Sequence, residues 1–129
     1  DGTASPSYGI SCTLRDYGLF HQWIAQGTAP KSFYASTKNL DKDLYGKSEG
    51  GKGAAALLET RVAYASQAWL MPEREIIYTL GSYGQVGFSH LPTGITVVFM
   101  QDWEDNGVPT KYKETVDRAL YVIDQVKTK

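Results

Sequence analysis

Residues 91–100, LPTGITVVFM, decide the fold. Residues 91–94 combine Pro and Gly as tight turns do, and residues 95–100 form an apolar run rich in β-branched side chains. A run of this kind favours a β-strand, because branched side chains pack well on a pleated surface. The stretch therefore predicts a strand that is entered from a turn, as in a hairpin-linked antiparallel sheet.

Further strand signals precede this stretch. Residues 86–90 and 75–80 each predict a strand, and residues 63–71 predict a longer one with both faces at least partly covered. Pro-Glu-Arg at 72–74 predicts a turn, and GSYGQ at 81–85 breaks or bends the chain. We expect an antiparallel sheet of three to four strands.

Helices are predicted on both sides of these strands. Residues 13–26 repeat apolar side chains at helical spacing, and Thr13 with Asp16 resembles a capping box. Residues 111–127 repeat apolar side chains three and four apart. The first helix is expected to bury an aromatic face formed by Leu14, Tyr17, Phe20, Trp23 and Ile24. The fold class is therefore α+β, an antiparallel sheet flanked by an N-terminal and a C-terminal helix.

The segment between the first helix and the strands is polar. Residues 27–53 predict irregular connections with a short helix around 36–45, and residues 54–61 predict a second helix. The stretch 46–52, GKSEGGK, has the spacing of a phosphate-binding P-loop up to its Lys. Gly53 then stands where a Ser or Thr would bind Mg²⁺, so we expect a solvated loop instead.

Composition bounds the class of protein. The 129 residues suffice for one domain, and 42% of them are hydrophobic. With 13 basic and 14 acidic residues the net charge is −1, which provides no basic field for nucleic acid. The apolar runs are too short to span a bilayer. We therefore expect no nucleic-acid partner and no membrane span.

Cysteine and histidine offer few candidates for chemistry. Cys12, the only cysteine, opens the first helix and could be a reactive thiol, but a small half-buried packing residue is the favoured interpretation. His21 and His90 lie far apart in the sequence without a neighbouring cluster at ligand spacing, so no metal site is predicted. His21 is expected to be a partly buried helix residue.

Three stretches resemble the C-terminal third of the β-lactamase-related serine hydrolases, which include class C β-lactamases, penicillin-binding carboxypeptidases, esterases and nylon-oligomer hydrolases. Residues 9–20, GISCTLRDYGLF, resemble a helix entry of that family. Residues 64–69 are similar to its Tyr- and Trp-rich strand. GSYGQ at 81–85 followed by TGITVV at 93–98 is similar to its glycine-rich turn and the strands after it. The turn-rich residues 1–9 read like a loop entered in the middle of a longer chain.

The resemblance implies that residues 1–129 are one segment, the C-terminal part of a larger β-lactamase-like α/β/α sandwich. It implies hydrolysis of a small ester or amide through an acyl-enzyme, without a cofactor, in a periplasmic or secreted protein. The family's nucleophile lies in a Ser-x-x-Lys pair, and a Tyr-x-Asn motif supplies a base. Neither motif occurs in this sequence. We therefore expect the Ser-x-x-Lys pair on an upstream segment, and no activity from the chain alone.

The family's third motif is a turn that supplies one oxyanion-hole N–H. By resemblance, the backbone N–H of Ser82 would be that donor, and Tyr83, Gly84 and Gln85 would bind substrate. The Lys or His that usually precedes this turn is missing, which favours esterase or amidase chemistry over β-lactam hydrolysis. The alternative for residues 81–85 is a β-bulge that only bends the strand.

A different class of function stays open from the sequence. The chain could be a non-catalytic binding or scaffolding module with a β-lactamase-like half-fold. An upstream Ser-x-x-Lys partner is the feature that would separate the two hypotheses.

Overall fold

A five-stranded antiparallel sheet forms the centre of the computed structural model, which describes residues 11–40, 43, 45–65, 67–104 and 109–127. The strands follow one another across the sheet in chain order, so each pairs with its sequence neighbour. They are β1 (Ala63–Ala65), β2 (Ala68–Met71), β3 (Ile76–Leu80), β4 (Gln85–His90) and β5 (Ile95–Met100). The antiparallel α+β prediction is confirmed, with five strands in place of three to four.

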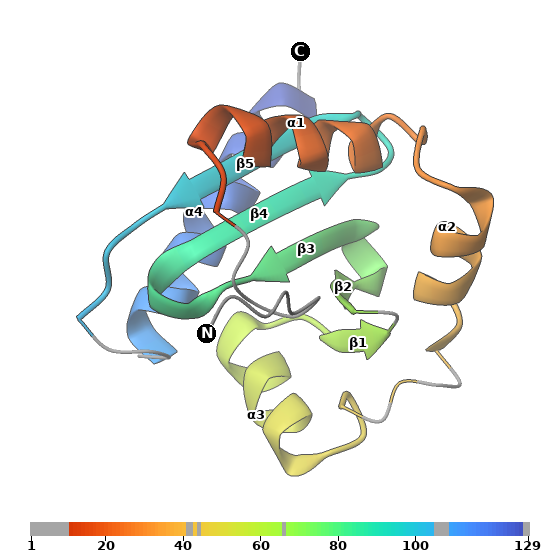
Figure 1. Ribbon diagram of the computed structural model, residues 1–129. Helices are drawn as coiled ribbons and strands as arrows, with labels where there is room; N and C mark the ends of the chain where they lie inside the picture. Colours follow the sequence, from red (N-terminus) through yellow and green to blue (C-terminus); the bar gives the residue numbers. More distant parts are fainter. Residues whose placement is uncertain (1–10, 41–42, 44, 66, 105–108, 128–129) are drawn as a thin grey trace, which may run out of the picture.

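Helices cover both faces of this sheet (Figure 1). Helix α1 (Leu14–Ala25) lies in front of β4 and β5, and α4 (Pro109–Lys127) lies behind them. Helix α3 (Glu49–Leu58) packs beside α4, and the short α2 (Lys31–Thr37) lies near β1. The chain therefore forms an α/β/α arrangement with the sheet as the middle layer.

The two faces of the sheet differ in side-chain size. Toward α4, aromatic rings from adjacent strands lie in a row, with Trp69 stacked on Tyr78 and Tyr78 on Phe88. Toward α1, β4 presents the small residues Gly87 and Ser89. Because these side chains are short, α1 can approach the strands closely.

The expected single strand at residues 63–71 is wrong. The structure divides it into β1 and β2, which pair antiparallel with Ala65 opposite Ala68. Gln67 adopts a left-handed backbone conformation with φ 65°, and such a conformation reverses a chain within a two-residue turn. No Gly or Pro marks this reversal in the sequence, so alternation alone suggested an unbroken strand.

The predictions for the polar segment also need correction. The short helix lies at Lys31–Thr37 instead of around 36–45, and α3 begins at Glu49 instead of residue 54. Ser48 caps α3, because its side chain accepts the backbone N–H of Gly51. A Cβ on Gly51 would lie 2.0 Å from the Tyr45 carbonyl oxygen. The glycines that suggested a solvated loop at 46–52 thus allow close packing at the start of a helix.

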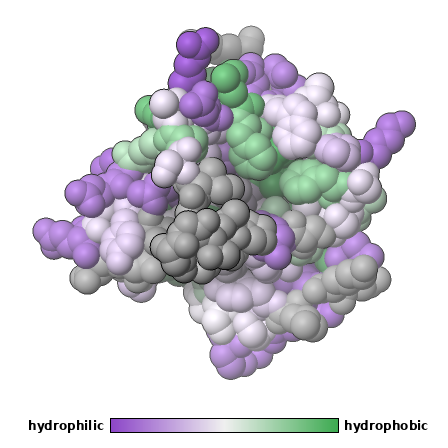
Figure 2. Space-filling view, in the orientation of Figure 1, coloured by the Kyte–Doolittle hydropathy of each residue, from purple (hydrophilic) through white to green (hydrophobic). Residues whose placement is uncertain are grey.

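Helix α1 follows its predicted limits, and the Thr13–Asp16 capping box is present. Its predicted buried face is wrong in part: Ile24 is buried and Tyr17 half-buried as expected, but Leu14, Phe20 and Trp23 are 50%, 46% and 42% exposed. His21, which is buried beside Ile24, takes the place expected for the large aromatic side chains. Figure 2 shows apolar surface over the part of this view where α1 lies.

The exposure of Cys12 and the apolar length of the helices bear on two further expectations. Cys12 is exposed, which contradicts its expected half-buried packing role. In the described ranges, no helix has the length and apolar character needed to cross a membrane.

Candidate functional site

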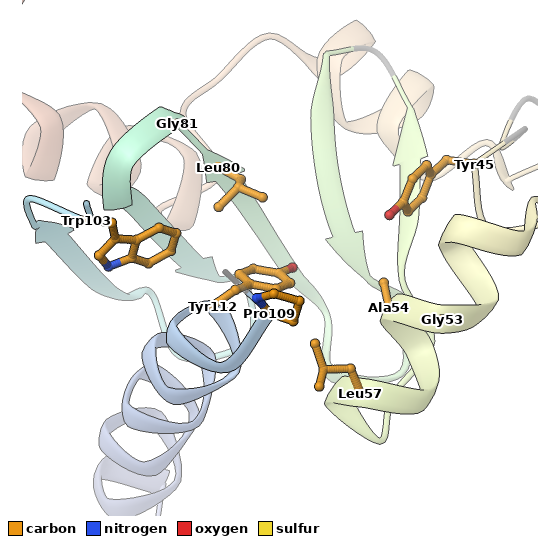
Figure 3. Close-up of a pocket in the computed structure, with 9 residues that line it drawn as sticks. All are labelled: Tyr45, Gly53, Ala54, Leu57, Leu80, Gly81, Trp103, Pro109 and Tyr112. Carbon is orange, nitrogen blue, oxygen red and sulfur yellow. The ribbon is translucent and has the colours of Figure 1, made fainter. Parts of the chain in front are cut away.

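A pocket of about 480 Å³ opens at the carboxyl end of β3 (Figure 3). Four separate stretches of chain form its walls: the loop before α3 together with α3, the end of β3, the segment after β5, and the start of α4. The lining residues are Tyr45, Gly53, Ala54, Leu57, Leu80, Gly81, Trp103, Pro109 and Tyr112. Its volume lies within the usual range of small-molecule sites, about 300–1,000 Å³.

The turn between β3 and β4 begins at this pocket. Gly81 lines the pocket and donates its backbone N–H to the Gln85 carbonyl at 2.7 Å, which closes the turn. Within it, Ser82–Gly84 form a short 3₁₀ segment that is kinked at its middle residue. Tyr83 has φ 61° and ψ 20°, a left-handed conformation that costs an ordinary residue roughly 1–2 kcal/mol. Strain of this kind is often stored at functional sites.

Neighbouring segments hold the strained turn in place. The Tyr83 carbonyl accepts the N–H of Trp103 at 3.0 Å, and the Gly84 carbonyl accepts that of Gln101 at 3.2 Å. A Cβ on Gly84 would lie 2.8 Å from both of these side chains, so only glycine fits here. The Gln85 side chain donates to the Gln101 carbonyl at 3.2 Å.

The turn is also tied to α4. The Gln101 side-chain amide donates to the Thr115 hydroxyl at 3.0 Å, and that hydroxyl donates to the Lys111 carbonyl at 2.8 Å. Because Thr115 is buried, this connection is shielded from water. The turn and the start of α4 thus form one rigid side of the pocket.

Asp43 fixes the opposite side. It is fully buried, and its Oδ1 accepts the backbone N–H groups of Gly46 at 2.8 Å and Tyr64 at 3.1 Å. Arg61 lies 3.9 Å from its other carboxylate oxygen. These contacts hold the loop that carries Tyr45, whose ring packs edge-on against Trp69 at 4.7 Å. Asp43 therefore positions a pocket wall without lining the pocket.

Two tyrosine hydroxyls meet beside the pocket. Tyr112 lines it, and its hydroxyl lies 2.8 Å from that of the buried Tyr78. Burial raises the pKa of Tyr112 to about 12 and raises the pKa of Tyr78 as well. Both hydroxyls are therefore neutral at physiological pH, and Tyr112 is a poor general base in this arrangement.

A second polar group is enclosed between α1 and the sheet. His21 is fully buried, more than the partial burial expected, and its two ring nitrogens lie 2.8 Å from the hydroxyls of Ser89 and Thr79. The Ser89 hydroxyl donates to the His21 carbonyl, so it accepts from Nδ1–H. Nε2 then accepts from Thr79, whose oxygen is left to accept from the Tyr17 hydroxyl.

This neutral chain of hydrogen bonds predicts a pH effect. Burial lowers the pKa of His21 to about 4 from an ordinary value of 6.5. Below pH 6.5 the unfolded chain binds a proton that the folded chain rejects, so stability falls as the pH drops. The loss should be about 1.4 kcal/mol per pH unit and about 3 kcal/mol by pH 4.

Urea unfolding between pH 7.5 and 4.5 measures this effect, with His21→Gln as the control. The glutamine variant has no group to titrate at this position, so its stability should fall less steeply over the same range. Parallel pH profiles for the two proteins would contradict the assignment of this effect to His21.

The sequence pointed to the turn but not to the pocket. Of the predicted stretch, Ser82 begins the 3₁₀ turn, although its side chain lies outside the described part of the structure. Tyr83 is 51% exposed and does not line the pocket. The pocket residues Trp103 and Tyr112 were missed; an aromatic residue in the polar segment after the last strand was the available signal.

Within the described ranges, no group of three or more His, Cys, Asp or Glu side chains could hold a metal ion. Comparison of the chain with protein-family models, with curated proteins and with solved structures finds no match.

Proposed function

We propose that this chain is the C-terminal portion of a β-lactamase-related serine hydrolase, which cleaves an ester or amide through an acyl-enzyme. The observation that carries the proposal is the strained turn at Ser82–Gly84, held rigidly at the edge of a pocket. An oxyanion hole needs a preorganised backbone N–H beside a cavity, because its donors must already point to where negative charge develops. In this proposal the turn supplies that backbone.

The layer arrangement supports the same proposal. Helices on both faces of an antiparallel sheet, with the last helix following the last strand, are what the resemblance implies for this part of the family. In this proposal the Ser82 N–H stabilises the oxyanion. The substrate-binding role of Tyr83, Gly84 and Gln85 stays a prediction, and the contacts of the last two with neighbouring segments keep the turn rigid. The nucleophile belongs to a Ser-x-x-Lys pair on an upstream segment.

Covalent labelling tests the proposal. The full-length gene product should react with a fluorophosphonate at one serine, because an activated serine attacks the phosphorus and displaces fluoride. Peptide mapping should place the label on a Ser-x-x-Lys serine outside residues 1–129. Ser82→Ala should be labelled like the parent, and heat-denatured protein should not. A label on a serine within this chain, or none at all, would overturn the proposal.

One observation favours the alternative of a non-catalytic binding module. None of the nine described residues that line the pocket is a Ser, Cys, His, Lys, Asp or Glu, so this part of the lining offers no nucleophile. A pocket that binds a small molecule in a protein that resists labelling would support this second function.

A further inference from the structure

We infer that the pocket at the end of β3 binds the uncharged aromatic or aliphatic group of the substrate, so that the enzyme selects neutral apolar esters or amides. This inference rests on the proposed function, because it takes the ligand of the pocket to be the substrate of a hydrolase. The binding of such a group to the pocket can be measured without any catalysis.

The described residues of the lining carry no formal charge and are largely apolar. Leu57, Leu80 and Trp103 provide apolar surface from three different elements, and Figure 3 shows their side chains around a common space. An apolar group gains roughly 25 cal/mol for each Å² of its surface that leaves water here. A carboxylate would lose its hydration and find no cation among the lining residues that the structure describes.

The two tyrosine hydroxyls do not change this selectivity. Tyr112 and Tyr78 hydrogen-bond to each other, and both remain protonated well above neutral pH because they are buried. They therefore present a neutral dipole at the pocket wall instead of a phenolate. A ligand with one polar atom could share this pair without introducing charge.

The place of the pocket connects it to the proposed chemistry. Gly81 belongs both to the lining and to the turn that begins with Ser82. In the proposed complex, a scissile carbonyl at the Ser82 N–H lies next to the wall formed by Gly81 and Leu80, and one of its substituents occupies the pocket. The missing Lys or His of the third motif fits this reading, because a neutral substrate needs no cation there.

Gly53 offers a matched pair of variants. It lies on the α3 wall, and a Cβ added to it meets nothing within 4 Å. Gly53→Leu should project a side chain into the pocket region, whereas Gly53→Ala adds only a methyl group to the same helix position. Both replace glycine by a good helix former, so neither is expected to unfold α3.

Binding of 2-naphthylacetamide and 2-naphthylacetate to the full-length gene product, followed by tryptophan fluorescence, tests the pocket. The two probes share a ring and differ in charge. The amide should bind at least about tenfold more tightly than the carboxylate, a difference of about 1.4 kcal/mol. Gly53→Leu should weaken amide binding by about tenfold, and Gly53→Ala, which adds only one methyl group to the same wall, should weaken it much less. Equal binding of both probes, or no effect of Gly53→Leu, would overturn the inference.

A kinetic arm separates this inference from the proposed function. With p-nitrophenyl phenylacetate and the p-nitrophenyl monoester of succinate, kcat/KM should favour the neutral ester, and Gly53→Leu should reduce that preference. Selective binding of the amide without fluorophosphonate labelling would support the inferred specificity of the pocket and contradict the proposed hydrolase function. Labelling with no preference between the two esters would support the hydrolase function and contradict the inferred specificity of the pocket.

Discussion

Replacing Gly87 by alanine should lower the free energy of unfolding by about 3 kcal/mol, among the largest effects of one added methyl group. A Cβ at this position would lie 2.1 Å from Nε2 of His21 and 2.3 Å from the adjacent ring carbon. His21 cannot withdraw, because hydrogen bonds to Ser89 and Thr79 fix both of its ring nitrogens. The methyl group must therefore push α1 away from β4. Urea unfolding monitored by circular dichroism measures the loss.

Two variants show whether the clash is the cause. Gly53→Ala adds the same methyl group where nothing lies within 4 Å, and inside a helix it should stabilise by about 0.5–1 kcal/mol. In a His21→Ala background the ring is absent, so Gly87→Ala should cost far less than in the parent. If the two substitutions at 21 and 87 are additive, the contact between them is not what limits alanine at this position.

The local elements were predictable because their signals are local. The capping box that opens α1 and the β-branched run of β5 each lie within a few residues, and the structure keeps both. The hairpin at Gln67 was not predictable in this way, since a left-handed glutamine has no signature in the sequence. There, pairing with the rest of the sheet overrides the local pattern.

The buried face of α1 depends on a partner that the helix sequence does not contain. Hydrophobic spacing favours Phe20 and Trp23 as the core face, but the strands opposite present Gly87 and Ser89. A small, partly polar surface accepts a polar ring such as His21 more readily than a large indole. Helical periodicity identifies the helix, while the sheet chooses which side of it is buried.

Of the candidate site, likewise, one part was predictable from the sequence and the other was not. Ser82 could be proposed from sequence, because a glycine-rich turn between two strands is a contiguous motif. The pocket could not, since its walls come from residues as distant as Tyr45 and Tyr112, and only the closed fold brings them together. The absence of a Lys or His from the turn at residues 81–85 was visible in the sequence. The uncharged character of the described pocket residues was not, because the fold brings them together.

Under the proposed function, replacing Ser82 by proline should reduce kcat of the full-length gene product by about a hundredfold to a thousandfold, or ~3–4 kcal/mol of transition-state stabilisation. Proline has no N–H to donate, so the proposed oxyanion hole loses one of its donors. The fold should tolerate the change. Residue 82 is the first residue of a 3₁₀ turn, a position that suits proline, and Gly81 has the extended conformation that proline requires before it.

Ser82→Ala is the matched control, because it removes the hydroxyl and keeps the N–H. It should retain most of the activity of the parent, and the proline variant should unfold at a similar urea concentration and still acquire the fluorophosphonate label slowly. Tyr83→Phe and Tyr83→Ala extend the comparison along the turn: if the ring contacts substrate, KM should rise more for alanine than for phenylalanine. A folded Ser82→Pro enzyme that turns over like the parent would make residues 81–85 a structural bend, and the oxyanion donor would have to lie elsewhere.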